Sequence, residues 1–201
     1  MSYLKIKSHA KINLALNVVG KTSSLHKVES IVSFLNLHDQ ILIRSIKHKN
    51  HKIKFIGRFS NNITSNNTVS KLLEIIDKKR FLKNTKFEII IKKNIPFKAG
   101  LGGGSMNAAS ILKFLIEKKL IKISKREIYK ICNLIGSDVI LGLYSNNLIL
   151  KSNKVIRRFK IKKKINTLLV KPNFGCSTKK IYSKVKKFKK AEFNLPRKYM
   201  F

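Results

Sequence analysis

The segment Ile95–Ala109, with the sequence IPFKAGLGGGSMNAA, decides the fold because it joins a glycine-rich loop to the start of an amphipathic helix. The glycines at positions 100, 102, 103 and 104 have no Cβ atom, so the backbone can adopt positive φ angles and approach an anion closely. The first N–H groups of a helix that opens near Ser105 have no partner inside that helix, so they are available to a ligand. The spacing therefore predicts a phosphate-binding loop, and a nucleotide is the first ligand to consider.

Other glycine-rich motifs fit this segment less well. A P-loop requires a lysine after its last glycine, where this chain has Ser105 and Met106. A Rossmann fingerprint requires a strand after the helix, whereas the periodicity here predicts a second helix. A tight strand-to-helix turn without a ligand would not need four glycines within five residues, since each one raises the entropic cost of folding.

Length and composition predict a globular protein of one domain or slightly more. The chain has 201 residues, of which 43% are hydrophobic, so it can bury a core. We find no secretory signal pattern and no uncharged apolar stretch of membrane-spanning length, so we expect a cytoplasmic protein with no membrane partner. Cys132 and Cys176 lack metal-ligand or redox spacing, which predicts two reduced thiols.

The chain carries a formal net charge of +36, from 45 basic and 9 acidic residues. Such a charge is typical of nucleic-acid-binding proteins. The lysines, however, are spread through every segment together with many Ile and Asn residues, and they do not form one face interleaved with aromatic side chains. We therefore expect nonspecific binding to polyanions, and a basic nucleic-acid-binding module remains an alternative hypothesis.

Hydrophobic periodicity predicts an α+β fold. Strands come first and are then mixed with helices, without regular alternation. A turn is expected at residues 36–39, and Thr68 and Ser124 are the expected N-caps of two helices, the second ending at Gly136. The predicted strands cover residues 12–18, 28–37, 40–46, 52–56, 87–91, 147–150, 154–159 and 166–170, and the predicted helices 69–76, 105–115, 124–135 and 178–185.

Three further residues could carry chemistry. Asp138 is one of only nine acidic residues and lies between a helix-ending glycine and an apolar run, so it is either a turn residue or a catalytic acid. Lys11, taken alone, is predicted to be a solvated strand lysine, and His26 an exposed turn histidine. His48 and His51 lie among lysines and make no convincing metal site.

The combination of motifs resembles the GHMP kinases, whose phosphate loop reads Pro-x-x-x-Gly-Leu-Gly-x-Gly-Ser followed by small residues. Residues 96–109 fit that pattern throughout. Residues 10–14 (AKINL), 25–27 (LHK) and 135–139 (IGSDV) resemble three other family motifs in the same order, and residues 172–182 resemble a later substrate segment. Within the family the chain resembles the branch that acts on a cytidine-diphosphate-linked methylerythritol in the non-mevalonate isoprenoid pathway.

The resemblance implies an ATP-dependent small-molecule kinase that uses Mg²⁺. Asp138 would take the proton from the substrate hydroxyl, Lys11 would lie beside it, and the Ser105 hydroxyl would be a candidate for the Mg²⁺ shell. The implied ATP-binding residues are Asn67, Lys93, Pro96, Phe97, Lys98, Ala99, Gly100, Leu101, Gly102, Gly103, Gly104, Ser105 and Met106, and the implied substrate-binding residues are Asn13, His26, Thr178 and Tyr182.

The sequence departs from the family pattern at three positions. His9 replaces a proline, and Ser24 and Leu25 replace a Gly-Tyr pair whose ring would stack on cytosine. A GHMP kinase for another small alcohol is therefore a further alternative.

The resemblance also implies a domain organisation. Residues 1–150 would form the GHMP kinase N-terminal ATP-binding domain, a two-layer fold of mixed sheet and helices like domain 2 of ribosomal protein S5. Residues 151–201 would begin a C-terminal region. Relatives continue into a second lobe with a motif resembling Gly-Thr-Gly-Ala, which this sequence does not contain, so we expect a fragment of a longer protein, with a non-catalytic remnant as the alternative.

Overall fold

The computed structural model describes residues 2–23, 26–61, 63–144, 146–159, 165–171 and 178–194. The chain divides into two compact units, neither of which is continuous in sequence. The first unit comprises residues 1–10, 35–97 and 101–143, and the second comprises residues 11–34, 98–100 and 144–201. The expected domain boundary at residue 150 stays a prediction.

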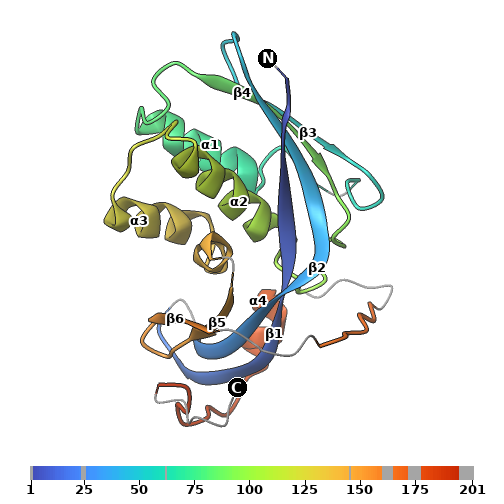
Figure 1. Cartoon of the computed structure of the whole chain (residues 1–201). Coiled ribbons are helices and arrows are strands. Elements are labelled where there is room, and N and C mark those ends of the chain that lie inside the picture. Colours follow the sequence, from blue (N-terminus) through green and yellow to red (C-terminus); the bar gives the residue numbers. More distant parts are fainter. Residues whose placement is uncertain are drawn as a thin grey trace. The chain divides into compact units, whose positions relative to one another are not determined.

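Helices follow strands and are then interspersed with them, as an α+β fold requires (Figure 1). In chain order the elements are β1 (Leu4–Lys21), β2 (His26–Ile46), β3 (Lys52–Ile56), α1 (Thr68–Lys78), β4 (Lys86–Lys92), α2 (Gly103–Glu117), α3 (Lys125–Ile135), the 3₁₀ helix η1 (Val139–Leu143), β5 (Asn147–Leu150), β6 (Ile156–Phe159) and α4 (Thr178–Ser183).

The first unit is a mixed sheet covered on one face by helices (Figure 1). The second half of β2 pairs antiparallel with β4, so that Gln40 lies opposite Lys92 and Ile46 opposite Lys86, and β3 pairs parallel with β4. Every second residue of these strands, such as Ile89, is buried against the helices because side chains alternate between the faces of a strand. The two-layer architecture that the family resemblance implies is confirmed for this unit.

Helix α2 is held close to η1 by small residues. At Gly142 an ideal Cβ would lie 2.6 Å from the Ala109 Cβ and 3.0 Å from the Met106 sulfur, which leaves no room for a side chain. Val139 and Leu141 of η1 are buried beside it. The approach of η1 to α2 therefore depends on the absence of a side chain at Gly142.

The second unit is built on the first half of β2. Residues 30–32 of β2 pair antiparallel with β5, which pairs in turn with β6. The fully buried Glu29 accepts hydrogen bonds from the backbone N–H groups of Glu192 (2.9 Å) and Phe193 (3.0 Å), and from the Asn17 amide (3.0 Å). A single carboxylate thus holds the segment around residue 192 onto the strand.

Two predicted elements are wrong, and one cap is shifted. Residues 36–39 form no turn, because β2 continues through them and the Asp39 side chain is fully buried among partners distant in sequence. Residues 166–170 form no strand, and Leu168 and Val170 are 87% and 82% exposed, since the described residues offer no neighbouring strand to pair with them. Asn67, not Thr68, is the N-cap of α1, and Thr68 is its first residue.

The remaining composition-based expectations concern membranes and thiols. Within the part of the chain that the structure describes, no helix combines the length and apolarity needed to cross a bilayer. Burial raises the pKa of the Cys132 thiol to about 11, which makes it a poor nucleophile. Cys176 lies outside the described residues.

We predict that Gly142→Ala lowers the free energy of unfolding by about 1–3 kcal/mol, because the new methyl group overlaps Ala109 and Met106. Urea denaturation measures this change. Gly20→Ala is the control: its Cβ would lie 3.7 Å from the nearest atom, on Lys27, and should change stability by no more than about 1 kcal/mol. Equal stability of the two variants would contradict the packing described for η1.

Candidate active site

The N-terminus of α2 presents unpaired backbone donors. Gly102, the N-cap residue, has a left-handed conformation (φ 68°) and provides no side-chain cap. The first hydrogen bond of the helix runs from the Met106 N–H to the Gly102 carbonyl, at 2.9 Å. The amides of Gly103, Gly104 and Ser105 therefore precede the hydrogen-bonded part of the helix, and donors of this kind, together with the helix dipole, favour an anion.

The start of α2 packs tightly against its neighbours on two sides. At Gly103 an ideal Cβ would lie 3.1 Å from Cγ2 of Ile95 and 3.4 Å from Nζ of Lys93. At Gly104 it would lie 3.2 Å from the Thr68 hydroxyl, which donates a 2.7 Å hydrogen bond to the Gly104 carbonyl. A side chain at either position would have to displace its neighbour by a few tenths of an ångström. Thr68 contributes a contact that sequence reasoning missed.

Asp138 lies in a turn next to the first turn of α2. The turn begins at Gly136, where α3 ends and where an ideal Cβ would lie 3.8 Å from the Ser105 hydroxyl. After Asp138 the chain enters η1, whose Gly142 packs against α2. The residue is half-buried, and its carbonyl accepts a 3.1 Å hydrogen bond from the Leu141 N–H. The backbone around this acid is thus fixed to α2 on both sides.

The expected ATP-binding residues outside the glycines have defined structural roles. Asn67 caps α1: its side-chain oxygen accepts from the N–H groups of Val69 and Ser70, and its amide donates to two loop carbonyls. Lys93 is 5% exposed and pairs with Asp39. The Met106 side chain is 2% exposed and faces the core at Gly142.

The loop before α2 is exposed and includes unusual backbone angles. Phe97 is 40% exposed, and Lys98, Gly100 and Gly102 all have positive φ angles (53°, 74° and 68°). The glycines adopt this conformation without strain, whereas Lys98 does so at some cost. Residues 98–100 belong to the second unit.

The first expected substrate residues lie on β1 and β2 in the second unit. Lys11 is 5% exposed, with its Nζ 3.5 Å from Oδ1 of Asn13, which also accepts a 3.2 Å hydrogen bond from the Ser30 hydroxyl. Lys11 is therefore not the solvated lysine that its context alone predicts. Because Asp138 belongs to the first unit, its pairing with Lys11 stays a prediction.

An aromatic cluster in the second unit includes two more of the expected substrate residues. The rings of His26 and Tyr182 stack with their centroids 5.2 Å apart and an interplanar angle of 22°, and Phe188 lies 6.5 Å from His26. Thr178 opens α4, but its side chain, like residues 24 and 25, lies outside the described part of the chain. His26 is thus an aromatic stacking residue, which its turn context did not predict.

The described residues provide few side-chain ligands for a metal ion. Among the described residues no group of three His, Cys, Asp or Glu side chains could hold one. Mg²⁺ commonly binds substrate phosphates and water with one or two protein oxygens, so a single hydroxyl such as that of Ser105 fits such a site.

Asp39 is a buried residue near the loop that sequence reasoning missed. Its carboxylate accepts hydrogen bonds from the N–H groups of Asn94 (2.8 Å) and Ile95 (2.9 Å) and pairs with Lys93. The sequence signal for this role is an acid between two apolar strand patterns in a chain with few acids, but the same polar residues also predict a turn.

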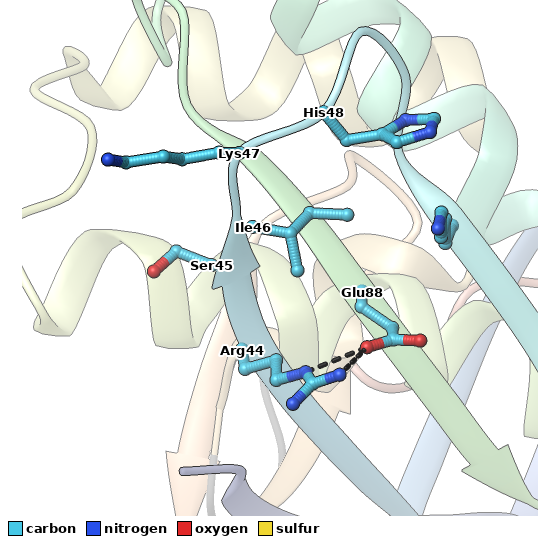
Figure 2. Close-up of a pocket in the computed structure, with 7 residues that line it drawn as sticks. Arg44, Ser45, Ile46, Lys47, His48 and Glu88 are labelled. Carbon is cyan, nitrogen blue, oxygen red and sulfur yellow. Dashed lines mark hydrogen bonds and ion pairs between the residues drawn. The ribbon is translucent and has the colours of Figure 1, made fainter. Parts of the chain in front are cut away.

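A hollow of about 360 Å³ lies elsewhere in the first unit (Figure 2). It lies where Ile46 pairs with Lys86, about 20 Å along the strands from the end that leads into the glycine-rich loop. Arg44 forms a 2.5 Å ion pair with Glu88, and its hydrogen bond lowers the pKa of Glu88. The lining residues are Arg44, Ser45, Ile46, Lys47, His48, Lys52 and Glu88. This hollow is separate from the glycine-rich loop.

Comparison with known sequences agrees with the geometry. Residues 67–146 match the family described as GHMP kinases N terminal domain. The 4-diphosphocytidyl-2-C-methyl-D-erythritol kinase of Pelagibacter ubique (strain HTCC1062) is 61% identical over 201 residues, covering 100% of this chain and 72% of the relative. The enzyme of the same name from Clostridium tetani (strain Massachusetts / E88) is 35% identical, covering 92% of this chain and 65% of the relative. The chain thus spans about two thirds of the length of these relatives.

Comparison with solved structures confirms the fold. A crystal structure of 4-(cytidine 5'-diphospho)-2C-methyl-D-erythritol kinase superposes with a TM-score of 0.62 at 19% identity, covering 78% of this chain and 55% of that chain. Homoserine kinase from Cytophaga hutchinsonii superposes with a TM-score of 0.55 at 16% identity, covering 80% of this chain and 52% of that chain. Together with the sequence relatives, these findings show that the chain belongs to the 4-diphosphocytidyl-2-C-methyl-D-erythritol kinase family of GHMP kinases.

Proposed function

We propose that this chain binds ATP at the N-terminus of α2 and transfers its γ-phosphoryl group to the 2-hydroxyl of 4-diphosphocytidyl-2-C-methyl-D-erythritol. The observation that carries the proposal is the position of the Asp138 turn beside the uncapped amides of Gly103, Gly104 and Ser105. The substrate is proposed from the names of the relatives at 61% and 35% identity.

Phosphate binding follows from the charge and geometry of the helix terminus. Three successive amides and the helix dipole favour an anion, and the absence of side chains at Gly103 and Gly104 lets phosphate oxygens approach the backbone. The exposed loop that precedes α2, including Phe97 and Lys98, would border the rest of the nucleotide. These residues act by binding and orientation, which supply most of the catalysis in phosphoryl transfer.

The acid in the turn would act on the acceptor. Asp138 accepts the proton of the substrate hydroxyl, and the oxygen bonds to the γ-phosphorus as the bond from that phosphorus to the bridging oxygen of ADP breaks. The role proposed for Lys11 is to offset the negative charge that develops on the substrate oxygen. Mg²⁺, when bound with the nucleotide, would neutralise phosphate charge, with Ser105 as its protein ligand.

The acceptor would be recognised in the second unit. His26, Tyr182 and Phe188 form an aromatic cluster with the flat surfaces that a pyrimidine base can stack on. Asn13 offers an amide near Lys11 for hydrogen bonding. Thr178, at the start of α4, completes the proposed substrate residues.

We predict that Asp138→Asn lowers turnover by about 10²- to 10⁴-fold, because the amide cannot take the hydroxyl proton. ADP release with the cytidylyl substrate measures turnover, and calorimetric titration with ADP should show unchanged nucleotide affinity. Glu117→Gln is the matched control, since Glu117 is 64% exposed at the end of α2 and its loss should leave turnover unchanged. Wild-type turnover in the Asp138 variant would overturn the proposed role.

We predict that Gly103→Val weakens ADP binding by about tenfold or more, because the added methyl groups displace Ile95 or Lys93 and shift the loop. Calorimetric titration of folded protein measures this loss. The contrast with Asp138→Asn separates binding from chemistry. Equal ADP affinity in the two variants would contradict phosphate binding at the start of α2.

A further inference from the structure

Both carboxylate oxygens of Asp39 have partners in the first unit. Its side chain is fully buried in β2, where an ionised carboxylate is stable only if its oxygens are paired. Oδ1 accepts from the N–H groups of Asn94 (2.8 Å) and Ile95 (2.9 Å), and Oδ2 pairs with the ammonium of Lys93. One side chain therefore engages three consecutive residues.

These three residues connect the end of β4 to the glycine-rich loop. Two other hydrogen bonds also fix them: the Lys93 N–H donates to the Ile56 carbonyl at 2.7 Å, and the Asn94 amide donates to the His38 carbonyl at 2.9 Å. The chain therefore enters the loop from a position set by β2 and β3. Asp39 and Lys93 are the charged groups among these contacts.

The groups that Asp39 holds lie directly against the start of α2. The Ile95 side chain and the Lys93 ammonium are 3.1 Å and 3.4 Å from an ideal Cβ at Gly103. Gly103 provides the first of the three amides that precede the hydrogen-bonded part of the helix. A shift of residues 93–95 would therefore displace the amides themselves.

The ion pair also sets the charge beneath the phosphate site. An unpaired carboxylate at Asp39 would repel phosphate, whereas its pairing with Lys93 leaves the pair neutral. The pair then adds no net charge beside the amides and the helix dipole. Lys93, an expected ATP-binding residue, thus acts here through Asp39.

We propose that Asp39 is a positioning residue for phosphoryl transfer, which holds residues 93–95 so that the amides of α2 lie where the nucleotide phosphates bind. The inference rests on the proposed function, because it assumes that ATP binds at the start of α2. Nucleotide affinity then depends on the hydrogen bonds that residue 39 accepts from the Asn94 and Ile95 amides. It does not depend on the stability that the ion pair with Lys93 provides.

Two variants separate the role of Asp39 as a hydrogen-bond acceptor from the role of its negative charge. Asp39→Asn keeps an oxygen that can accept from both backbone amides but loses the ion pair, so its melting temperature should fall. Its ADP affinity should stay at or above that of the wild type, because the unpaired Lys93 ammonium attracts phosphate. The double variant Asp39→Leu with Lys93→Met removes both charges and the acceptor. We expect it to bind ADP about tenfold more weakly or worse.

Glu29→Leu is the matched control. Glu29 is also fully buried and accepts from two consecutive backbone amides, those of Glu192 and Phe193, but in the second unit. Its loss should lower the melting temperature without changing ADP affinity. Titration calorimetry with ADP and Mg²⁺, at a temperature where every variant is folded, measures all four proteins.

A measurement on the wild-type chain covers the case in which the double variant does not fold. Hydrogen exchange at the Asn94 and Ile95 amides should slow when ADP binds, because binding and loop position are linked, while exchange at Glu192 and Phe193 should not change. The inference would be overturned if ADP did not change the exchange rates of the Asn94 and Ile95 amides. It would also be overturned if the ADP affinities of the variants fell in proportion to their melting temperatures. Wild-type protein that binds no ADP would overturn the proposed function and this inference together.

Discussion

The site depends on one constraint, which is that the first three amides of α2 are left without a side-chain cap. Most helices satisfy such donors with the side chain of Ser, Thr, Asn or Asp at the N-cap, as Asn67 does for α1. At α2 the N-cap is Gly102 in a left-handed conformation, followed by two more glycines, so the donors stay open. The helix gives up capping stability and gains a site where an anion can bind the backbone.

The surrounding structure compensates for this weak helix start by fixing it from several directions. Thr68 donates a hydrogen bond to the Gly104 carbonyl. Ile95 and Lys93 lie against Gly103, and both are bound by the Asp39 carboxylate. On the other side, the turn at Gly136 approaches Ser105, and η1 packs on α2 through Gly142. Small residues recur at these contacts because each partner must come close to the helix backbone.

The sequence predicted those parts of the molecule whose signals are local. Helices α1 and α3 are indicated by the spacing of their own apolar residues, and α2 by the order of strand, loop and helix around the glycines. The predicted bounds of these helices are close to the observed ones. The role of Asp39 could not be predicted, because its partners at positions 93–95 lie more than fifty residues away. Residues 166–170 have a strand pattern, yet a strand forms only with a partner. The roles of Lys11, Asp138 and Thr178 come from family resemblance and stay predictions.

The central claim is that nucleotide phosphates bind the amides of Gly103, Gly104 and Ser105. Two-dimensional ¹H–¹⁵N NMR spectra of the chain, titrated with ADP and Mg²⁺, test it most directly. We expect these three amide resonances to move downfield as they donate hydrogen bonds to phosphate, with the largest changes in the spectrum. Unchanged resonances at these positions, with shifts confined to the hollow around Arg44 and Lys52, would contradict it.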